Sequence, residues 1–453
     1  MANGYPTRPR TTGVFSGLLL IIFGFLLLLH NYGHLQISNL FRHWWPLIFI
    51  FWGASKLYER TVAQRQGRSS GWITPGEVFL VLALMTVVGL VIAYDSTKNE
   101  LGNIGINVGD SHSFDFDVPP QTLPANAHVS IRGGRGNITV RSSDDQTIRV
   151  TGQKRVRAWT EEEAERHSHQ MSVAISDHGG GSFEIVPTGF DLSDSRMAVD
   201  MDVVLSKKTV LTVANDRGDI TISDMTGDVS VFTKKGNLEV NDTTGNVNIE
   251  TRSGDTKVTD TKGDIKIAGR GGEVEAVNAT GSLVVDGEFF GSVRADKIAK
   301  GVRFISQRTD FTLTQLGGHF EKSTGNMEVA DAPGNLTSRT KNVSVSLENV
   351  TGRIVLDNSN GSVEVQFSNP PKEDISINNE RASVTLLMPS SSNFEIQADC
   401  RSCDINSEFS GGSLNPTKTG KGDSHLEGKY GAGRGPKITL KTSYDSIEVR
   451  KTT

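Results

Sequence analysis

The sequence predicts a mainly β protein: a parallel β-solenoid with about two strands in each 18-residue coil, preceded by three transmembrane helices. Three observations lead to this prediction. A glycine recurs every nine residues through the middle of the chain, a pair of apolar residues follows most of these glycines, and the first hundred residues hold three long apolar stretches. The composition agrees, because 36% hydrophobic and 22% charged residues are typical of a chain with a buried core.

The N-terminal part is predicted to lie in a membrane. Residues 14–29 are uncharged and apolar, residues 40–58 include WWPLIFIFWGA, and residues 76–94 include VFLVLALMTVVGLVIAY. Each stretch approaches the ~20 residues that cross ~30 Å of hydrocarbon. We therefore divide this part into a cytoplasmic N-terminus (1–11), a transmembrane hairpin (12–60), a cytoplasmic loop (61–75), a third transmembrane helix (76–95) and a linker (96–114).

The basic residues around these spans predict their orientation. Arg8 and Arg10 precede the first span. Four basic residues lie between the end of the second span and the start of the third (Lys56, Arg60, Arg65 and Arg68), whereas only Arg42 separates the first two. The positive-inside rule then places everything after Asp95 outside the cytoplasm. We expect a multi-pass protein of the bacterial cytoplasmic (inner) membrane with a periplasmic or extracellular C-terminal domain. A cleaved signal peptide at 1–30 is the alternative, but no small-residue cleavage site follows it.

A nine-residue repeat defines the extracytoplasmic solenoid, which we place at residues 115–453. Two and four positions after most of the repeat glycines come apolar residues, a period of two that predicts a strand with one buried face. We expect glycine at each corner because a sharp turn needs positive φ. A meander of hairpins would share this local pattern, but its turns rarely keep one length, whereas a solenoid's do. The repeat glycines are Gly218, Gly227, Gly236, Gly245, Gly254, Gly263, Gly272 and Gly281.

The corners alternate in charge, which doubles the period to eighteen. An Asp precedes every second glycine by three residues, at Asp224, Asp242 and Asp260. A basic residue precedes the intervening glycines by two, at Lys234, Arg252 and Arg270. Two strands per coil would stack each set on its own edge, with ~4.8 Å between coils. The basic ladder is a candidate site for anionic envelope polymers, and its alternative role is that of a solvated edge.

The spacing of the glycines loosens after Gly281 and recovers at Gly334. Between them lie the aromatic-rich stretches DGEFFGSV and GVRFISQRTDFTL. We expect a distorted coil here, with the aromatic rings filling its core.

Cys400 and Cys403 are the two cysteines of the chain and form a C-x-x-C pair. Outside the cytoplasm a small structural disulfide is favoured over free thiols or a metal or redox role. The surrounding segment lacks the strand-to-helix pattern of a thioredoxin-like redox centre.

No motif in the sequence indicates an enzyme, a cofactor or a metal site. There is no Ser-His-Asp pattern, no nucleophile elbow, no phosphate loop and no His-rich metal spacing. The units have one glycine where calcium-binding nonapeptide repeats have more, and a net charge of −5 gives no field for nucleic acid. An enzyme acting on polysaccharides stays open as an alternative, because such chemistry needs only a few converging acid or base groups.

Two resemblances extend this interpretation. Residues 12–60, with GLLLIIFGFLLLLHNYGHL and WWPLIFIFWGASKLY, resemble the LiaI/LiaF-like transmembrane region of bacterial envelope proteins. Residues 115–451 resemble the bacterial putative-adhesin family of unknown function, whose members are membrane-anchored β-solenoids. The matching stretches are RVRAWTEEEAERHSHQMSVAI, in which Thr160 and Glu163 are placed as a capping box, and GPKITLKTSYDSIEVRK. The segment CRSC departs from the Ser-Gly corner that the family would have.

These observations predict a non-catalytic, membrane-anchored envelope protein whose solenoid binds or senses an external partner. The LiaI/LiaF resemblance implies envelope-stress regulation through a membrane-embedded regulatory protein. The basic ladder makes an anionic envelope polysaccharide a candidate ligand. The adhesin resemblance implies a surface adhesin or structural scaffold instead.

Overall fold

The computed structural model describes residues 109–192, 194–411, 414–419 and 422–452, together with Leu57, Thr61 and Thr86. The chain divides into two units, Met1–Val108 and Gly109–Thr453. The predicted transmembrane hairpin and third helix lie outside the described residues, apart from the single positions named above. Among the residues that are described, no helix is long and apolar enough to cross a membrane.

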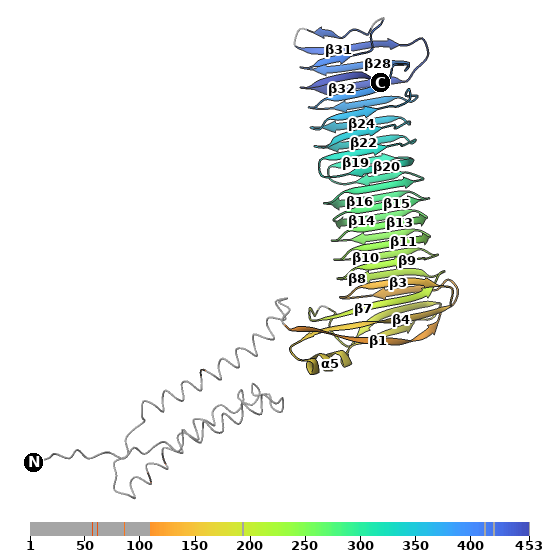
Figure 1. Cartoon of the computed structure of the whole chain (residues 1–453), viewed down its shortest axis with the longest axis vertical. Coiled ribbons are helices and arrows are strands. Elements are labelled where there is room, and N and C mark those ends of the chain that lie inside the picture. Colours follow the sequence, from red (N-terminus) through yellow and green to blue (C-terminus); the bar gives the residue numbers. More distant parts are fainter. Residues whose placement is uncertain are drawn as a thin grey trace, which may run out of the picture. The chain divides into compact units, whose positions relative to one another are not determined.

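The unit Gly109–Thr453 is built from two long sheets whose strands are mostly parallel (Figure 1). The first sheet has sixteen strands, in the order β1 (Asp110–Thr122), β4 (Thr147–Ala158), β7 (Met197–Ser206), β3 (Ile138–Ser143), β9 (Ile220–Ser223), β11 (Leu238–Thr244), β13 (Thr256–Lys262), β15 (Val274–Ala279), β17 (Val293–Ile298), β20 (Leu316–Lys322), β21 (Asn326–Ala330), β23 (Ser344–Glu348), β25 (Val363–Gln366), β27 (Val384–Pro389), β33 (Ser446–Thr452) and β29 (Asp404–Ser407).

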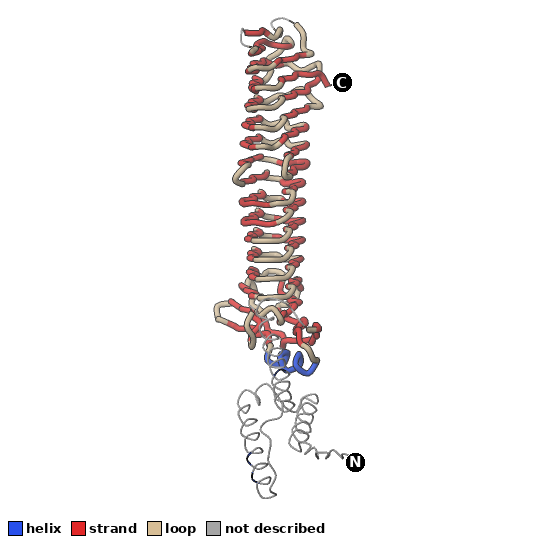
Figure 2. Tube along the Cα trace, turned by 90° about the vertical axis from the view of Figure 1, so that its left-hand side faces the viewer, coloured by secondary structure: helices blue, strands red, loops and turns tan. Residues whose placement is uncertain are grey.

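Strands of the second sheet pair successively and face the first sheet across the core (Figure 2). Their order is β5 (Ser172–Asp177), β6 (Ser182–Thr188), β2 (His128–Arg132), β8 (Val210–Asn215), β10 (Val229–Thr233), β12 (Val247–Thr251), β14 (Ile265–Gly271), β16 (Leu283–Phe289), β18 (Val302–Ile305), β19 (Thr309–Leu313), β22 (Leu336–Lys341), β24 (Ile354–Ser359), β26 (Ile375–Asn379), β32 (Lys437–Ser443), β28 (Phe394–Arg401), β31 (Asp423–Tyr430) and β30 (Thr417–Thr419).

The register confirms a coil of eighteen residues with two strands. In the second sheet Val229 pairs with Val247, and Val247 pairs with Ile265. The intervening strands β11 and β13 belong to the first sheet and pair with the same offset. The predicted alternation is also confirmed, because Val247 and Ile249 are buried while Asn248 is exposed. Each coil therefore contributes one apolar face to each wall of the core.

The repeat glycines are needed because consecutive coils approach closely. At Gly236 φ is +145°, and a Cβ would lie 2.0 Å from the carbonyl oxygen of Gly218 in the preceding coil. The expectation of positive φ at every corner glycine was wrong, since Gly227, Gly263, Gly272 and Gly281 do not adopt it. A Cβ at Gly227, Gly263 or Gly281 would still lie 2.1–2.4 Å from a backbone oxygen, and one at Gly272 would lie 2.1 Å from the Asp255 carboxylate. Close approach of the preceding coil is therefore the requirement that they share with Gly236.

One coil in the middle of the solenoid runs backwards, at the distortion that the loosened spacing predicted. Strand β19 pairs antiparallel with β18 and β22, and β20 pairs antiparallel with β17 and β21. Val302 and Leu336 stand in the same row on either side of β19, 34 residues apart, whereas residues two regular coils apart are separated by 36. The reversed coil thus takes the place of one regular coil and is two residues shorter.

The aromatic side chains of this region do not share one role. Phe311 and Phe320 are fully buried and stack with ring centroids 4.6 Å apart, which agrees with core filling. Phe290 of the stretch DGEFFGSV is instead 74% exposed. Its corner holds one residue more than the regular coil, because the pairing offset from β15 to β17 is nineteen, and the extra ring has no place in the core.

Both ends of the solenoid are closed by strands that break the simple repeat. At the N-terminal end β1, β4 and β7 are antiparallel, and helix α5 (Glu161–Gln170) lies against β4. The Thr160 hydroxyl accepts a hydrogen bond from the Glu163 N–H, and the Glu163 carboxylate accepts one from the Trp159 N–H. Strand β1 begins inside the segment 96–114 that the sequence assigned to a linker.

At the C-terminal end the last two strands of the chain lie between earlier ones. Strand β32 pairs with β26 on one side and β28 on the other, and β33 pairs with β27 and β29. The strands β28 and β29 therefore come earlier in the chain than β32 and β33, although β32 and β33 separate them from the preceding coil.

Candidate binding edge of the solenoid

Lys234, Arg252 and Arg270, which we call the cationic column, lie on one edge of the solenoid. They occur at the ends of β10, β12 and β14, whose parallel register stacks them one coil apart. All three are exposed. The structure therefore brings together the three basic residues that the sequence selected.

An acidic residue lies at each end of this column. The Lys234 Nζ lies 2.6 Å from an Asp216 carboxylate oxygen, and Arg270 is paired in register with Glu288. Within the column the Arg252 guanidinium lies 5.4 Å from the centroid of the Phe232 ring, a cation–π contact that leaves its hydrogen-bond donors free to face outward.

A second line of cations, which the sequence reasoning missed, runs beside the cationic column. It consists of Arg135, Arg217 and Lys235, each directly before a corner glycine. Arg135 and Arg217 form a parallel backbone bridge, and the Lys235 carbonyl accepts a hydrogen bond from the Gly218 N–H in the coil below. Partial burial, followed by the charge of Arg217, lowers the pKa of Arg135. The sequence did contain a signal for this second line, because each of its basic residues immediately precedes a corner glycine.

Carboxylates lie on this edge as well, one position after the corner glycines. Asp219 accepts the N–H of Asn237 at 2.8 Å, and Asp255 accepts the N–H of Glu273 at 2.8 Å. Each of these bonds joins one coil to the next. These short side chains are held along the backbone, whereas Lys and Arg have longer stems that reach beyond them into solvent. The outermost charges of the edge are therefore cationic.

Asp224, Asp242 and Asp260, the acidic column, lie on the opposite edge. Asp224 follows β9, and the other two lie within the C-terminal halves of β11 and β13. Their φ angles are 62°, 51° and 52°, so each adopts the left-handed conformation that Asp and Asn tolerate better than most residues. Further along the same edge Asn278 and Asp331 have φ angles of 59° and 53°. A backbone requirement thus explains why Asp or Asn recurs at these positions.

Cys400 and Cys403 are joined by a disulfide at the corner between β28 and β29. Both are buried, and between them Ser402 has a φ of 56°. The Ser424 hydroxyl donates to the Cys403 carbonyl at 2.7 Å, which ties this corner to β31. The pair therefore fastens a tight turn at the C-terminal end of the solenoid.

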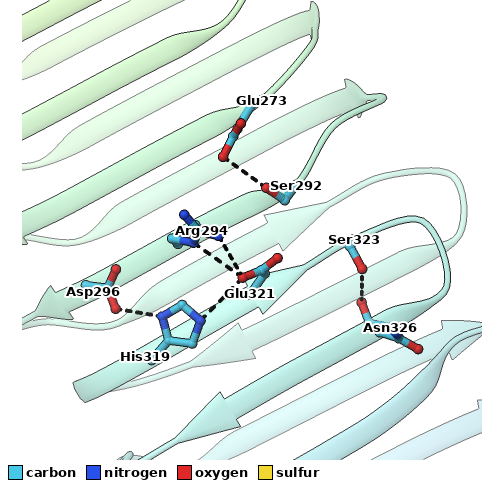
Figure 3. Close-up of polar contacts among 8 residues, drawn as sticks. All are labelled: Glu273, Ser292, Arg294, Asp296, His319, Glu321, Ser323 and Asn326. Atoms are coloured by element: carbon cyan, nitrogen blue, oxygen red, sulfur yellow. Dashed lines mark hydrogen bonds and ion pairs between the residues drawn. The ribbon is translucent and has the colours of Figure 1, made fainter.

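A polar cluster on the outer face of the first sheet was also missed by sequence reasoning (Figure 3). Arg294 and Asp296 of β17 face Glu321 and His319 of β20. The Arg294 guanidinium donates to Glu321 at 3.1 and 3.3 Å, and the His319 Nδ1 lies 2.6 Å from Asp296. No sequence pattern links these four residues, since the reversed coil is what brings β17 and β20 together. Within the described ranges of the chain, no group of three or more His, Cys, Asp or Glu residues is arranged to hold a metal ion.

Comparison with protein families finds one match, in the N-terminal segment. Residues 14–57 match the family model described as the LiaI-LiaF-like transmembrane region. This part of the chain is thus similar to that family of membrane regions. The LiaI-LiaF-like region indicates that the protein is associated with a membrane, in agreement with the resemblance seen at 12–60. No curated protein matches the sequence.

Several solved structures with some likeness to the chain carry adhesin-like names. They include a putative cell adhesion protein from Clostridium sporogenes (8% identity, 76% of this chain and 100% of that one, TM-score 0.17), a putative adhesin from Bacteroides fragilis (11%, 76% and 98%, TM-score 0.14) and a putative adhesin from Parabacteroides merdae (10%, 76% and 97%, TM-score 0.18). At such TM-scores and identities the superpositions carry no conclusion about function.

Proposed function

We propose that this protein is a non-catalytic envelope protein, anchored by its LiaI-LiaF-like region, whose solenoid binds an anionic envelope polymer along the cationic column. The observation that carries the proposal is the stacking of Lys234, Arg252 and Arg270 at successive coils of a rigid scaffold. Like charges at this spacing repel one another, and an anionic polymer lying along the column would relieve that repulsion. Arg252 and Arg270 offer planar donors suited to carboxylate or phosphate groups.

The proposed location follows from the same anchoring. The basic residues that flank the spans support a multi-pass arrangement in the bacterial cytoplasmic membrane, with the loop 61–75 inside and the solenoid outside. In that position the cationic column would face envelope polymers and not nucleic acid.

Charge reversal on the cationic column tests the binding proposal. Replacing Lys234, Arg252 and Arg270 together by Glu should weaken binding to an anionic wall polymer at low salt by about tenfold or more. Each reversal at an exposed site changes the binding free energy by roughly 0.5–1 kcal/mol. Binding is measured by cosedimentation at two ionic strengths, because screening should reduce the difference between variants.

The acidic column supplies the matched control for that experiment. Asn at Asp224, Asp242 and Asp260 keeps the left-handed backbone conformation and should leave polymer binding unchanged. A Glu triple variant that stays folded and binds like the wild type would reduce the cationic column to a solvated edge.

We further propose that the LiaI-LiaF-like region acts with a membrane-embedded regulatory partner, in envelope-stress regulation. The family match at 14–57 supports this part of the proposal. Photocrosslinkers placed within 12–60 should capture one membrane protein reproducibly, whereas crosslinkers on the exposed face of β12 should not. A surface adhesin or scaffold would instead give no specific membrane crosslink while the solenoid stays accessible from outside the cell.

A further inference from the structure

Two strands that run against the solenoid carry the same short motif. Strand β20 contains Gly318-His319-Phe320-Glu321, and β31 contains Ser424-His425-Leu426-Glu427. In both, the middle apolar residue is buried and the His and Glu lie on the outer face. Each His stands directly opposite an Asp on the neighbouring antiparallel strand.

The contacts made by the two histidines are nearly identical. The His319 Nδ1 lies 2.6 Å from Asp296, and its Nε2 lies 3.6 Å from Glu321. The His425 Nδ1 lies 2.7 Å from Asp399, and its Nε2 lies 3.5 Å from Glu427. An imidazole between two carboxylates can donate to both only when it is protonated, because the neutral ring has one N–H.

The sites differ in one permanent charge. Arg294 stands opposite Glu321. Its hydrogen bonds to that carboxylate raise the pKa of the guanidinium, so this site holds a cation at every physiological pH. Opposite Glu427 stands the neutral Gln397. At the β31 site the cation that faces both carboxylates is therefore His425 itself.

The other charged groups around His425 do not replace it. On β32, Lys441 is paired in register with Asp399 from the far side. On β30, Lys418 makes its ion pair with Asp404 at 2.7 Å. On β31 itself, Asp423 accepts the Ser402 N–H and Lys429 pairs with Glu395.

We propose that protonation of His425 fastens β31 to β28, so that the C-terminal end of the solenoid opens more readily at mildly alkaline than at mildly acidic pH. This property goes beyond the proposed binding function and does not depend on it. Among the described strands, the short β30 alone pairs with the far side of β31, so the pairing of β31 with β28 governs whether the end stays closed.

The direction of the pH dependence follows from the hydrogen bonds of the imidazole. The hydrogen bond to Asp399, and after it the one to Glu427, raise the pKa of His425 above its usual 6.5, although partial burial opposes them. A group with a raised folded-state pKa adds stability that is complete below the unfolded value and is lost as the pH rises through the folded value. Closure should therefore weaken from about pH 6 toward pH 8.

Hydrogen exchange of the full chain in detergent micelles tests the proposal at residues 423–430. After correction for intrinsic exchange rates, we expect the wild type to be several-fold better protected at pH 6 than at pH 8. The His425→Gln variant should lose this difference, and Gln397→Arg, which copies the Arg294 arrangement opposite Glu427, should protect the strand at both pH values.

Strand β20 serves as the internal control, because Arg294 already faces its Glu321, and its protection should change less with pH. Equal protection of wild-type β31 at both pH values would overturn the proposal, as would a His425→Gln variant that keeps the wild-type difference. If His425→Gln leaves β31 unprotected at both pH values, the Gln397→Arg variant decides the question. An unchanged pH dependence of β31 protection in Gln397→Arg contradicts the proposal, and loss of that pH dependence supports it.

Discussion

Replacing Ile249 by Asp should destabilise the solenoid by about 3–5 kcal/mol, the largest effect that we expect from a single core substitution. Ile249 is 0% exposed and pairs in register with Val231 below and Ile267 above. A carboxylate there would lie in an apolar stack with no partner, so it would protonate or force water into the core. Because burial raises the pKa of such an acid, the penalty should grow as the pH rises.

The neighbouring residue supplies the control for this prediction. Asn248 points outward, between Ser230 and Lys266 of the adjacent strands, so Asn248→Asp should change stability by less than about 0.5 kcal/mol. Thermal unfolding followed by circular dichroism compares the two variants in the same detergent. Equal melting temperatures would show that the assigned register of β12 is incorrect.

Replacing Gly236 by Ala should cost about 3 kcal/mol or more, even though it adds a single methyl group. The Cβ would lie 2.0 Å from the Gly218 oxygen and 2.5 Å from its carbon, and φ at this position is +145°. Backbone atoms cannot move aside as a flexible side chain can. The coils would have to separate at this corner, which breaks the hydrogen bond from the Gly218 N–H to the Lys235 carbonyl.

A second glycine separates this steric effect from the general cost of losing glycine. Gly325 lies at the corner before β21, where an added Cβ would have no atom within 4 Å, and its φ is not positive. Gly325→Ala should be neutral or stabilising by up to about 1 kcal/mol, because it restricts the unfolded chain. Denaturant unfolding of both variants checks the difference, and similar midpoints would contradict the role of close coil approach.

Sequence alone was enough to predict the regular part of the fold. The spacing of glycines, the apolar pairs and the alternating corner charges predicted the 18-residue coil, the inward direction of Val247 and Ile249, and the separation of the cationic column from the acidic column. These features recur in every unit, so each unit gives the same independent evidence for the geometry of the coil. The capping box at Thr160 and Glu163 is likewise a local pattern that four residues specify.

The direction of the chain, by contrast, is visible only in the three-dimensional fold. A strand that runs backwards has the same period of two as its parallel neighbours, so the pattern around Phe311 and Phe320 indicated a strand but not its direction. Local sequence patterns also do not show that β32 and β33 lie between earlier strands, because these strands pair with partners far away in the sequence. The carboxylates that face His319 and His425 come from those pairings. Local periodicity therefore specifies the repeating unit, whereas every contact that depends on the direction and order of strands far apart in the chain arises from their pairing in space.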